Sequence, residues 1–417
     1  MISTLERQLF PFLALQAALS TLVGFGAVLV CAEFGVATTV HYTLILLAAA
    51  MAGPVLAFGC GHRLRLDSRA LVRGAFALPA LLLPWADGRP VLLALALGGF
   101  LGLSWAARHW IELSLIDDAQ RDAYAAHTTV LSVGVSLLAT LGASLWLSGA
   151  EAQAAVQAAI QNAPQNVPQN ATQPGTAGAA GLYRAHALLA LLAMTWAARR
   201  LPATPGVHCT APWQVLRQPA WRASLPLYFL ESGLLGIGMV MGASGAVRAL
   251  GQASHYGWVA TLATVAGAVA LYALRHRRHA GNRERWMALA CIGITLAQGL
   301  LGASALWPLL YVAHLLLQAG VGPFWSASEQ VLNQRTMDVH GALGDRIVVR
   351  EATLGVFRLG ALLAFWWAVQ ALDARLVLAI GAALMALATA LEFAVGRAWL
   401  RRHDAPAAPA TQQPARP

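Results

Sequence analysis

Apolar stretches of about 20 residues follow one another along almost the whole chain, separated by short polar segments. A run of this length, about 20 residues, can cross the hydrocarbon core of a bilayer as an α-helix. The pattern predicts six such helices in the first half of the chain, near residues 10–32, 41–60, 74–86, 91–107, 126–147 and 182–198. It predicts six more in the second half, near residues 223–245, 257–274, 286–303, 305–326, 348–371 and 376–398. We therefore expect an all-α integral membrane protein with twelve transmembrane helices.

Three polar segments interrupt this pattern and divide the chain. Residues 199–222 hold four prolines and four arginines, so we expect them to form a cytoplasmic linker rather than to cross a bilayer. Residues 149–181 carry an imperfect Gln-Asn-Ala-Pro repeat with no apolar face to bury, which predicts a disordered periplasmic loop. The tail, 401–417, is also expected to be disordered. These segments leave an N-terminal half at 1–198 and a C-terminal half at 223–400.

The low share of charged residues and the placement of the arginines are typical of a membrane protein. Only 11% of the residues are charged and 58% are hydrophobic, whereas a soluble domain has about 25% charged residues. All 28 basic residues are arginines, and arginines gather on the cytoplasmic side of a membrane. With both chain ends in the cytoplasm, 23 arginines fall on the inner side and four on the outer side. We therefore predict a multi-pass protein of the bacterial inner (plasma) membrane with cytoplasmic N- and C-termini, and we expect no nucleic-acid partner despite the net charge of +10.

Ionisable residues inside a predicted transmembrane helix are the first candidates for chemistry, because burying a charge in a bilayer is costly. Glu231 lies about eight residues into its helix, roughly 12 Å from the inner end at 1.5 Å per residue. Burial there favours the protonated carboxyl group, which suits the binding and release of a proton. The alternative is a fixed ion pair with Arg358, which lies at a similar depth in the helix at 348–371.

The end of the second helix and the loop after it carry a recognisable motif, from Gly53-Pro54 through Gly59-Cys60-Gly61 to His62-Arg63-Leu64. This stretch resembles the signature of the loop between helices 2 and 3 in the major facilitator superfamily, with Arg63 in the place of the family's arginine and His62 where the family has an aspartate. Twelve helices divided six and six by a basic linker also resemble that family. The resemblance implies two six-helix pseudo-repeats, alternating access to a central cavity, and a monomer.

The resemblance places further residues in that cavity, which helices 1, 4, 7 and 10 line in the family. His314 and Gln318 are four residues apart and share one face of the tenth helix, where they would join Glu231. Gln16 would contribute from the first helix, although a buried histidine or glutamine can also serve packing alone. We expect charged residues near the inner helix ends to form ion pairs that open and close as a gate, or else to be solvated loop charges: Arg63, Glu112, Asp118, Arg121, Asp345, Arg346 and Glu351.

These features predict a secondary active transporter of a small organic solute, coupled to protons and with export favoured over uptake. The four cysteines are isolated, and we find no metal or nucleotide motif, so no metal ion or cofactor is expected. Two alternatives remain. One is a transporter-like membrane sensor or scaffold. The other is a membrane acyltransferase that would use the His-x4-Asp spacing of His62 and Asp67, although we predict that the chain is not an enzyme.

Overall fold

The computed structural model describes residues 3–64, 66–116, 121–161, 178–274, 283–337 and 339–403, and these residues form helices and connecting turns without a β-strand. The first part of the chain forms α1 (Thr4–Leu64), α2 (Ser68–Leu82), η1 (Leu83–Trp85), α3 (Pro90–Leu115), α4 (Arg121–Gln161), α5 (Ala179–Leu192), η4 (Ala193–Ala197) and α6 (Ala198–Arg200). The second part forms α7 (Pro212–Arg217), α8 (Pro219–Tyr228), η5 (Phe229–Gly233), α9 (Leu235–Leu250), α10 (Ala253–Leu274), α11 (Arg283–Ala303), α12 (Leu310–Thr336), α13 (Leu343–Val369) and α14 (Ala374–His403).

Helix α1 covers the first two predicted helices and changes direction between them. The break is at Gly35, whose φ of 80° and ψ of 178° are not helical. A glycine adopts this conformation without the steric cost that a side chain would bring. The chain therefore turns back here without a separate loop.

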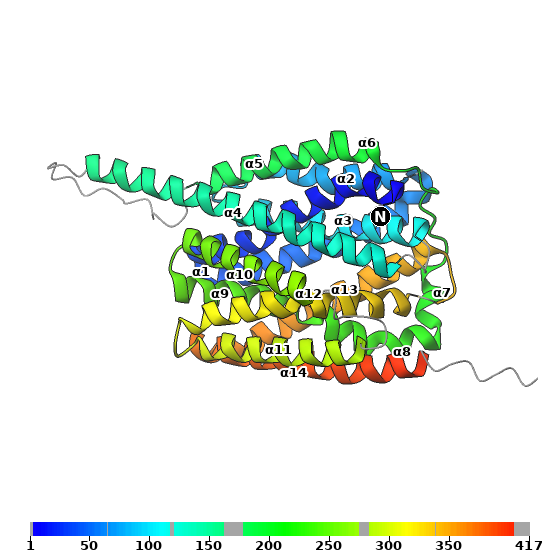
Figure 1. Cartoon of the computed structure of the whole chain (residues 1–417). Helices are drawn as coiled ribbons and strands as arrows, with labels where there is room; N and C mark the ends of the chain where they lie inside the picture. Colours follow the sequence, from blue (N-terminus) through cyan, green and yellow to red (C-terminus); the bar gives the residue numbers. More distant parts are fainter. Residues whose placement is uncertain are drawn as a thin grey trace, which may run out of the picture.

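The helices form two groups that pack against each other, residues 3–200 above and residues 219–403 below in Figure 1. Within the first group α3 packs on α1 and α2, and within the second α11 packs on α12 and α14. Helices α1 and α3 come very close, since a Cβ atom at Gly102 would lie 1.8 Å from the backbone oxygen of Ala50. Small residues permit such close helix contacts in membranes.

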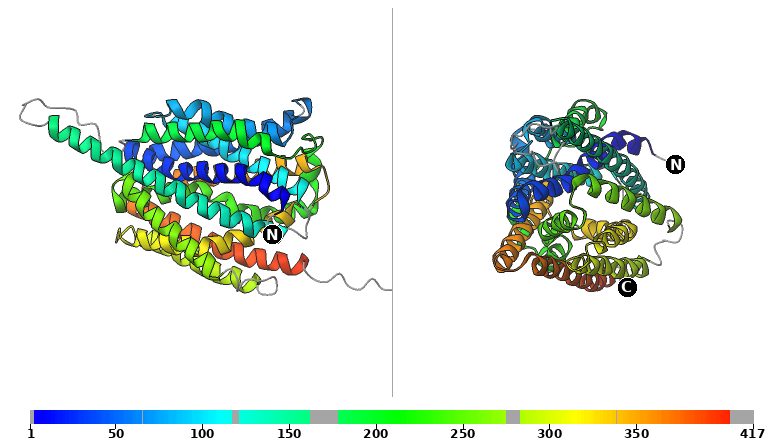
Figure 2. Two further views of the ribbon diagram at one scale, coloured as in Figure 1. Left: turned by 45° about the horizontal axis from the view of Figure 1, so that its top comes forward. Right: turned by 90° about the vertical axis from the view of Figure 1, so that its left-hand side faces the viewer.

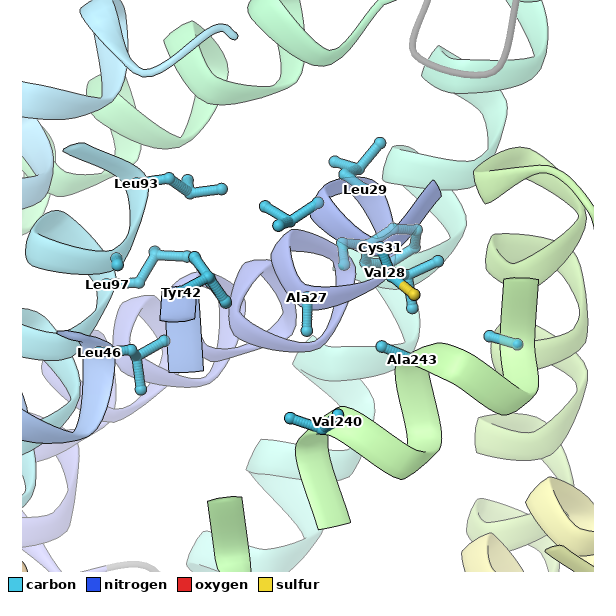
Figure 3. Close-up of a cluster of buried hydrophobic side chains, with 14 of the residues drawn as sticks. Ala27, Val28, Leu29, Cys31, Tyr42, Leu46, Leu93, Leu97, Val240 and Ala243 are labelled. Atoms are coloured by element: carbon cyan, nitrogen blue, oxygen red, sulfur yellow. The ribbon is translucent and has the colours of Figure 1, made fainter. Parts of the chain in front are cut away.

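The two groups meet along α1, α4, α9, α10 and α13. Figure 3 shows one part of this contact, where Ala27 and Val28 of α1 lie near Val240 and Ala243 of α9. All four side chains are buried in the largest hydrophobic cluster of the protein. The described ends of α1 and α14 lie at the same end of the bundle as α7 (Figures 1 and 2).

Several helices extend beyond their predicted bounds. The prediction ended the fourth helix near residue 107, but α3 continues to Leu115, and α12 continues to Thr336 rather than ending near 326. Residues 149–161, which we expected to be disordered, continue α4, while 162–177 lie outside the described residues. Polar residues at the ends of these helices caused the errors, because they read as loops in the sequence.

Eight helices of the described residues are long and apolar enough to cross a membrane. The bundle also exposes many large apolar side chains along its sides, including Leu56, Leu81 and Trp367. An exposed apolar surface of this kind suits contact with lipid acyl chains. Together with the all-helical architecture, it identifies a protein that is embedded in a membrane.

Candidate functional site

A cavity of about 590 Å³ lies between the two groups of helices. Helices α1, α3 and α4 line it from the first group, and η5, α12 and α13 line it from the second. This volume falls within the about 300–1,000 Å³ of pockets that enclose small organic ligands. Eight of its lining residues are ionisable, namely Arg108, His109, Glu112, Glu231, Glu329, Arg350, Glu351 and Arg358.

Glu231 reaches the cavity from η5, a five-residue π-helix between α8 and α9. Such π-bulges interrupt the regular α-helical bonding and occur often at functional sites. Its side chain is 12% exposed, and its Oε1 lies 3.5 Å from Nη2 of Arg350. The structure thus gives Glu231 a basic partner other than the Arg358 that the sequence suggested.

Arg350 connects several elements around the cavity. Its Nη1 donates to Oε1 of Glu351 at 2.8 Å and lies 3.4 Å from Nε2 of His109. His109 is on α3 and Arg350 on α13, so this contact joins the two groups of helices. A buried arginine needs such partners, because its charge is otherwise costly to remove from water.

Arg358 faces a neutral partner. Its Nε donates to Oγ of Ser232 at 2.8 Å, and its Nη2 donates to the same oxygen. Among the described residues no carboxylate lies within ion-pair distance of this guanidinium, although Glu351 and Glu231 act on it electrostatically. The arrangement leaves a positive charge at the cavity wall that a bound anion could balance.

Helix α3 contributes an ion pair and an aromatic surface to the opposite wall. Arg108 Nε donates to Oε1 of Glu112 at 2.6 Å, and its guanidinium lies 4.9 Å from the centre of the Trp105 ring. On α12, Trp325 Nε1 donates to Oε1 of Glu329 at 2.5 Å. The cavity therefore offers charges of both signs and a stacking surface.

Three of the residues predicted for the cavity lie elsewhere. His314 is buried in α12, where its Nδ1 is 2.8 Å from the backbone oxygen of Ala297. Gln16 is buried in α1 and donates to Oγ of Ser104 at 3.2 Å. Gln318 is half-buried on α12. Among the described residues that line the cavity, none of the three is present.

The predicted gate residues separate into different environments. Glu112 and Glu351 line the cavity, whereas Arg63 is exposed at the end of α1. Asp345 is 2% exposed and accepts hydrogen bonds from the linker, through the N–H groups of Thr210 at 2.7 Å and Ala211 at 3.0 Å. Arg346 donates to the backbone oxygen of Met337 at 2.7 Å. Asp118 and the side chain of Arg121 lie outside the described residues.

The sequence analysis missed Arg108, His109, Glu329 and Arg350 as site residues. All four lie beyond or near the predicted ends of their helices, and the charge pattern placed Arg108 and Arg350 among the arginines of the inner side. The spacing of Arg108 and Glu112, four residues apart, was an available signal of a helical ion pair. Glu329 and Arg350 have no comparable local signal, because their partners come from other helices.

The structure gives Asp67, one of the two residues of the acyltransferase alternative, a role in capping a helix. Asp67 caps the start of α2, where its Oδ1 accepts from the N–H of Ala70 at 2.8 Å. The side chain of His62 lies outside the described residues. Among the side chains that are described, no group of three or more histidine, cysteine, aspartate or glutamate residues could hold a metal ion.

Comparison with known proteins gives the fold. No family model matches the chain, and no curated protein matches it. Solved structures match over nearly the whole chain: the xylose transporter XylE from E. coli, in a partially occluded inward-open conformation, has a TM-score of 0.63 at 10% identity and covers 97% of this chain and 98% of its own. The nucleoside transporter NupG has a TM-score of 0.57 at 12% identity, covering 96% and 100%.

A bacterial homologue of the iron transporter ferroportin, in an outward-facing state, has a TM-score of 0.58 at 15% identity and covers 95% of this chain and 99% of its own. XylE is a major facilitator superfamily protein. The chain therefore has the all-α fold of major facilitator superfamily transporters and is a multi-pass membrane protein.

Proposed function

We propose that this protein is a secondary active transporter that moves a small organic solute across the membrane by alternating access and couples the movement to protons. The observation that carries the proposal is the cavity of about 590 Å³ between the two groups of helices, with Glu231 and Arg358 on its wall. A sensor or scaffold would not require a cavity of this size with so many ionisable groups.

The proposed topology has twelve membrane spans with both chain ends in the cytoplasm. The kink at Gly35 divides α1 into two spans, and α8, η5 and α9 together make one. The described ends of α1 and α14 lie at one end of the bundle with α7 (Figure 1). That end also carries helix ends rich in arginine, namely Arg199 and Arg200 at the end of α6, Arg217 at the end of α7 and Arg401 near the end of α14, which supports a cytoplasmic position.

We further propose that the structure is closed at the end opposite α7. There Ser144 of α4 lies 3.2 Å from Thr261 of α10, oxygen to oxygen, and Trp258 of α10 donates to Ser148 of α4 at 2.9 Å. The residues of α4 that line the cavity, 128–133, lie on the α7 side of these contacts. Alternating access would break the contacts at one end and form new ones at the other.

A comparison of metabolites inside and outside cells tests the transport function. The cells would lack the gene, express the wild type, express Glu231→Gln, or express Glu284→Gln as a control on a half-buried acid outside the cavity. We expect one compound to follow the wild type and the control but not Glu231→Gln, and the sign of its change gives the direction, for which we predict export. If all membrane-inserted forms give the same metabolite distribution, the sensor or scaffold function replaces this proposal.

A further inference from the structure

A buried carboxyl group on α14 has no role in the site described above. The side chain of Glu392 is 3% exposed, and its Oε1 has no hydrogen-bond partner among the described residues. A buried carboxylate without a donor or a cation is strongly disfavoured, whereas a protonated carboxyl group costs much less. Glu392 must therefore either hold a proton or lie beside a group that compensates its charge.

Among the described residues, the charged groups that act on Glu392 do not include a cation. Glu329 of α12 and Glu231 of η5 act on it electrostatically, and both are acids. On α11 the thiol of Cys291 interacts electrostatically with Glu392, is also buried, and donates to the backbone oxygen of Thr389. Like charges close together favour the protonated form of one member.

Three arginines on α14 and on the helices packed against it have other partners. Arg397, five residues further along α14, is bonded to Glu284 of α11. Arg222 of α8 donates to the backbone oxygen of Leu216 at 3.3 Å, and Arg248 of α9 donates to that of Ala305 at 2.9 Å. None of these three is a partner of Glu392.

We propose that Glu392 is a second proton-binding residue, which holds a proton behind the cavity wall and exchanges it with Glu329. In the exchange the O–H bond of the Glu392 carboxylic acid breaks and an O–H bond forms on the Glu329 carboxylate, so that one carboxyl group is neutral before and after. Glu329 acts on Glu392 electrostatically, lines the cavity and accepts from Trp325, which makes it the candidate link between Glu392 and the space where Glu231 lies. The inference rests on the proposed proton coupling and adds a reservoir to it.

Infrared spectroscopy of the full-length protein in lipid nanodiscs tests the inference without a transported solute. With 13C-labelled glutamate, the C=O band of a protonated carboxylic acid can be assigned to glutamate and followed against pH. We expect this band at neutral pH in the wild type and in Glu284→Gln, which removes a half-buried, ion-paired acid of the neighbouring helix. We expect Glu392→Gln to lose it. A band of unchanged intensity in Glu392→Gln overturns the proposal.

A second variant keeps the test decisive if Glu392→Gln does not fold. Glu329→Gln removes a negative charge near Glu392, so Glu392 should ionise more readily and its band should disappear at a lower pH. An unchanged midpoint in this variant also overturns the proposal. Since no solute is needed, the band can be present even if the protein proves not to transport, and the two proposals can fail separately.

Discussion

The guanidinium of Arg350 lies 3.5 Å from the carboxylate of Glu231 and so joins α13 to η5 at the wall of the cavity. Arg350 also donates to Glu351 at 2.8 Å, so two carboxylates share one cation. When a proton neutralises Glu231, Arg350 keeps a partner. Glu231 is therefore free to change its charge without leaving a buried arginine uncompensated, which suits a group that takes up and releases protons.

Replacing Arg350 and Arg358 should have different effects on stability. Arg350→Gln leaves Glu231 and Glu351 buried without their cation, and breaking such a pair costs about 3–5 kcal/mol. Arg358→Gln removes the donors to the neutral hydroxyl of Ser232 and leaves Glu231 and Glu351 with Arg350, so about 1 kcal/mol is expected. Thermal unfolding of the purified variants in detergent measures the difference. Equal losses would mean that Arg358 compensates buried acids as much as Arg350 does.

The fold was largely predictable from the sequence because hydrophobic periodicity and arginine placement act locally along the chain. The site was predictable only in part. Glu231 and Arg358 stood out because each is a charge deep inside an apolar run. Arg350 and Glu329 did not, because their burial depends on where α12 and α13 cross other helices, and no local pattern records that.

The linker prediction also shows this limit. Asp345 was expected to move in a gate, yet it is bound by the backbone of Thr210 and Ala211 and holds the linker against the start of α13. This role follows from a contact between residues more than a hundred positions apart, which the sequence alone does not reveal. The prolines at 199–222 predicted a linker, but nothing in the sequence indicated its attachment to α13.

We predict that Asp345→Ala releases the linker and exposes Cys209. Burial, and then the neighbouring Asp345, raise the pKa of the Cys209 thiol to about 12, so almost no thiolate exists at pH 8. Without Asp345 the pKa should fall toward its usual value of about 8.5, and maleimide should label Cys209 faster. Stability should also fall by about 1.5–3 kcal/mol for the lost hydrogen bonds to a charged group.

The labelling experiment needs a background in which Cys31, Cys60 and Cys291 are replaced by alanine. Asp373→Ala is the matched control, because Asp373 is an exposed aspartate that accepts from the N–H of Arg375 far from the linker. Its labelling rate at pH 8 should equal that of the parent. Equal rates in Asp345→Ala and the parent would show that Asp345 does not hold the linker.

The proposed topology predicts which turns a membrane-impermeant reagent can reach. Cysteines introduced in a cysteine-free background at Gly88, in the turn after η1, and at Asp373, in the turn before α14, should be labelled in intact cells. Cysteines at Thr204 in the linker and at His403 should be labelled only after the membrane is permeabilised. Labelling of Thr204→Cys in intact cells would place the linker outside and reverse the topology.

Substitution at Gly257 should disturb the contact that closes the bundle at the end opposite α7. A Cβ atom at Gly257 would lie 2.6 Å from Oγ of Ser144 and 3.2 Å from its Cα. Gly257→Val therefore pushes α10 away from α4, and overpacking of this kind costs about 1–3 kcal/mol. Only the conformation in which α4 and α10 touch is destabilised, so the population should shift toward molecules that are open at this end.

A cysteine at Ser148, which accepts from Trp258 in the same contact, reports the shift. Its labelling in intact cells should be faster with Gly257→Val than without it. Gly242→Val is the control, since a Cβ atom there meets nothing within 4 Å. If both variants label at the parent rate, the contact between α4 and α10 does not control access to this end.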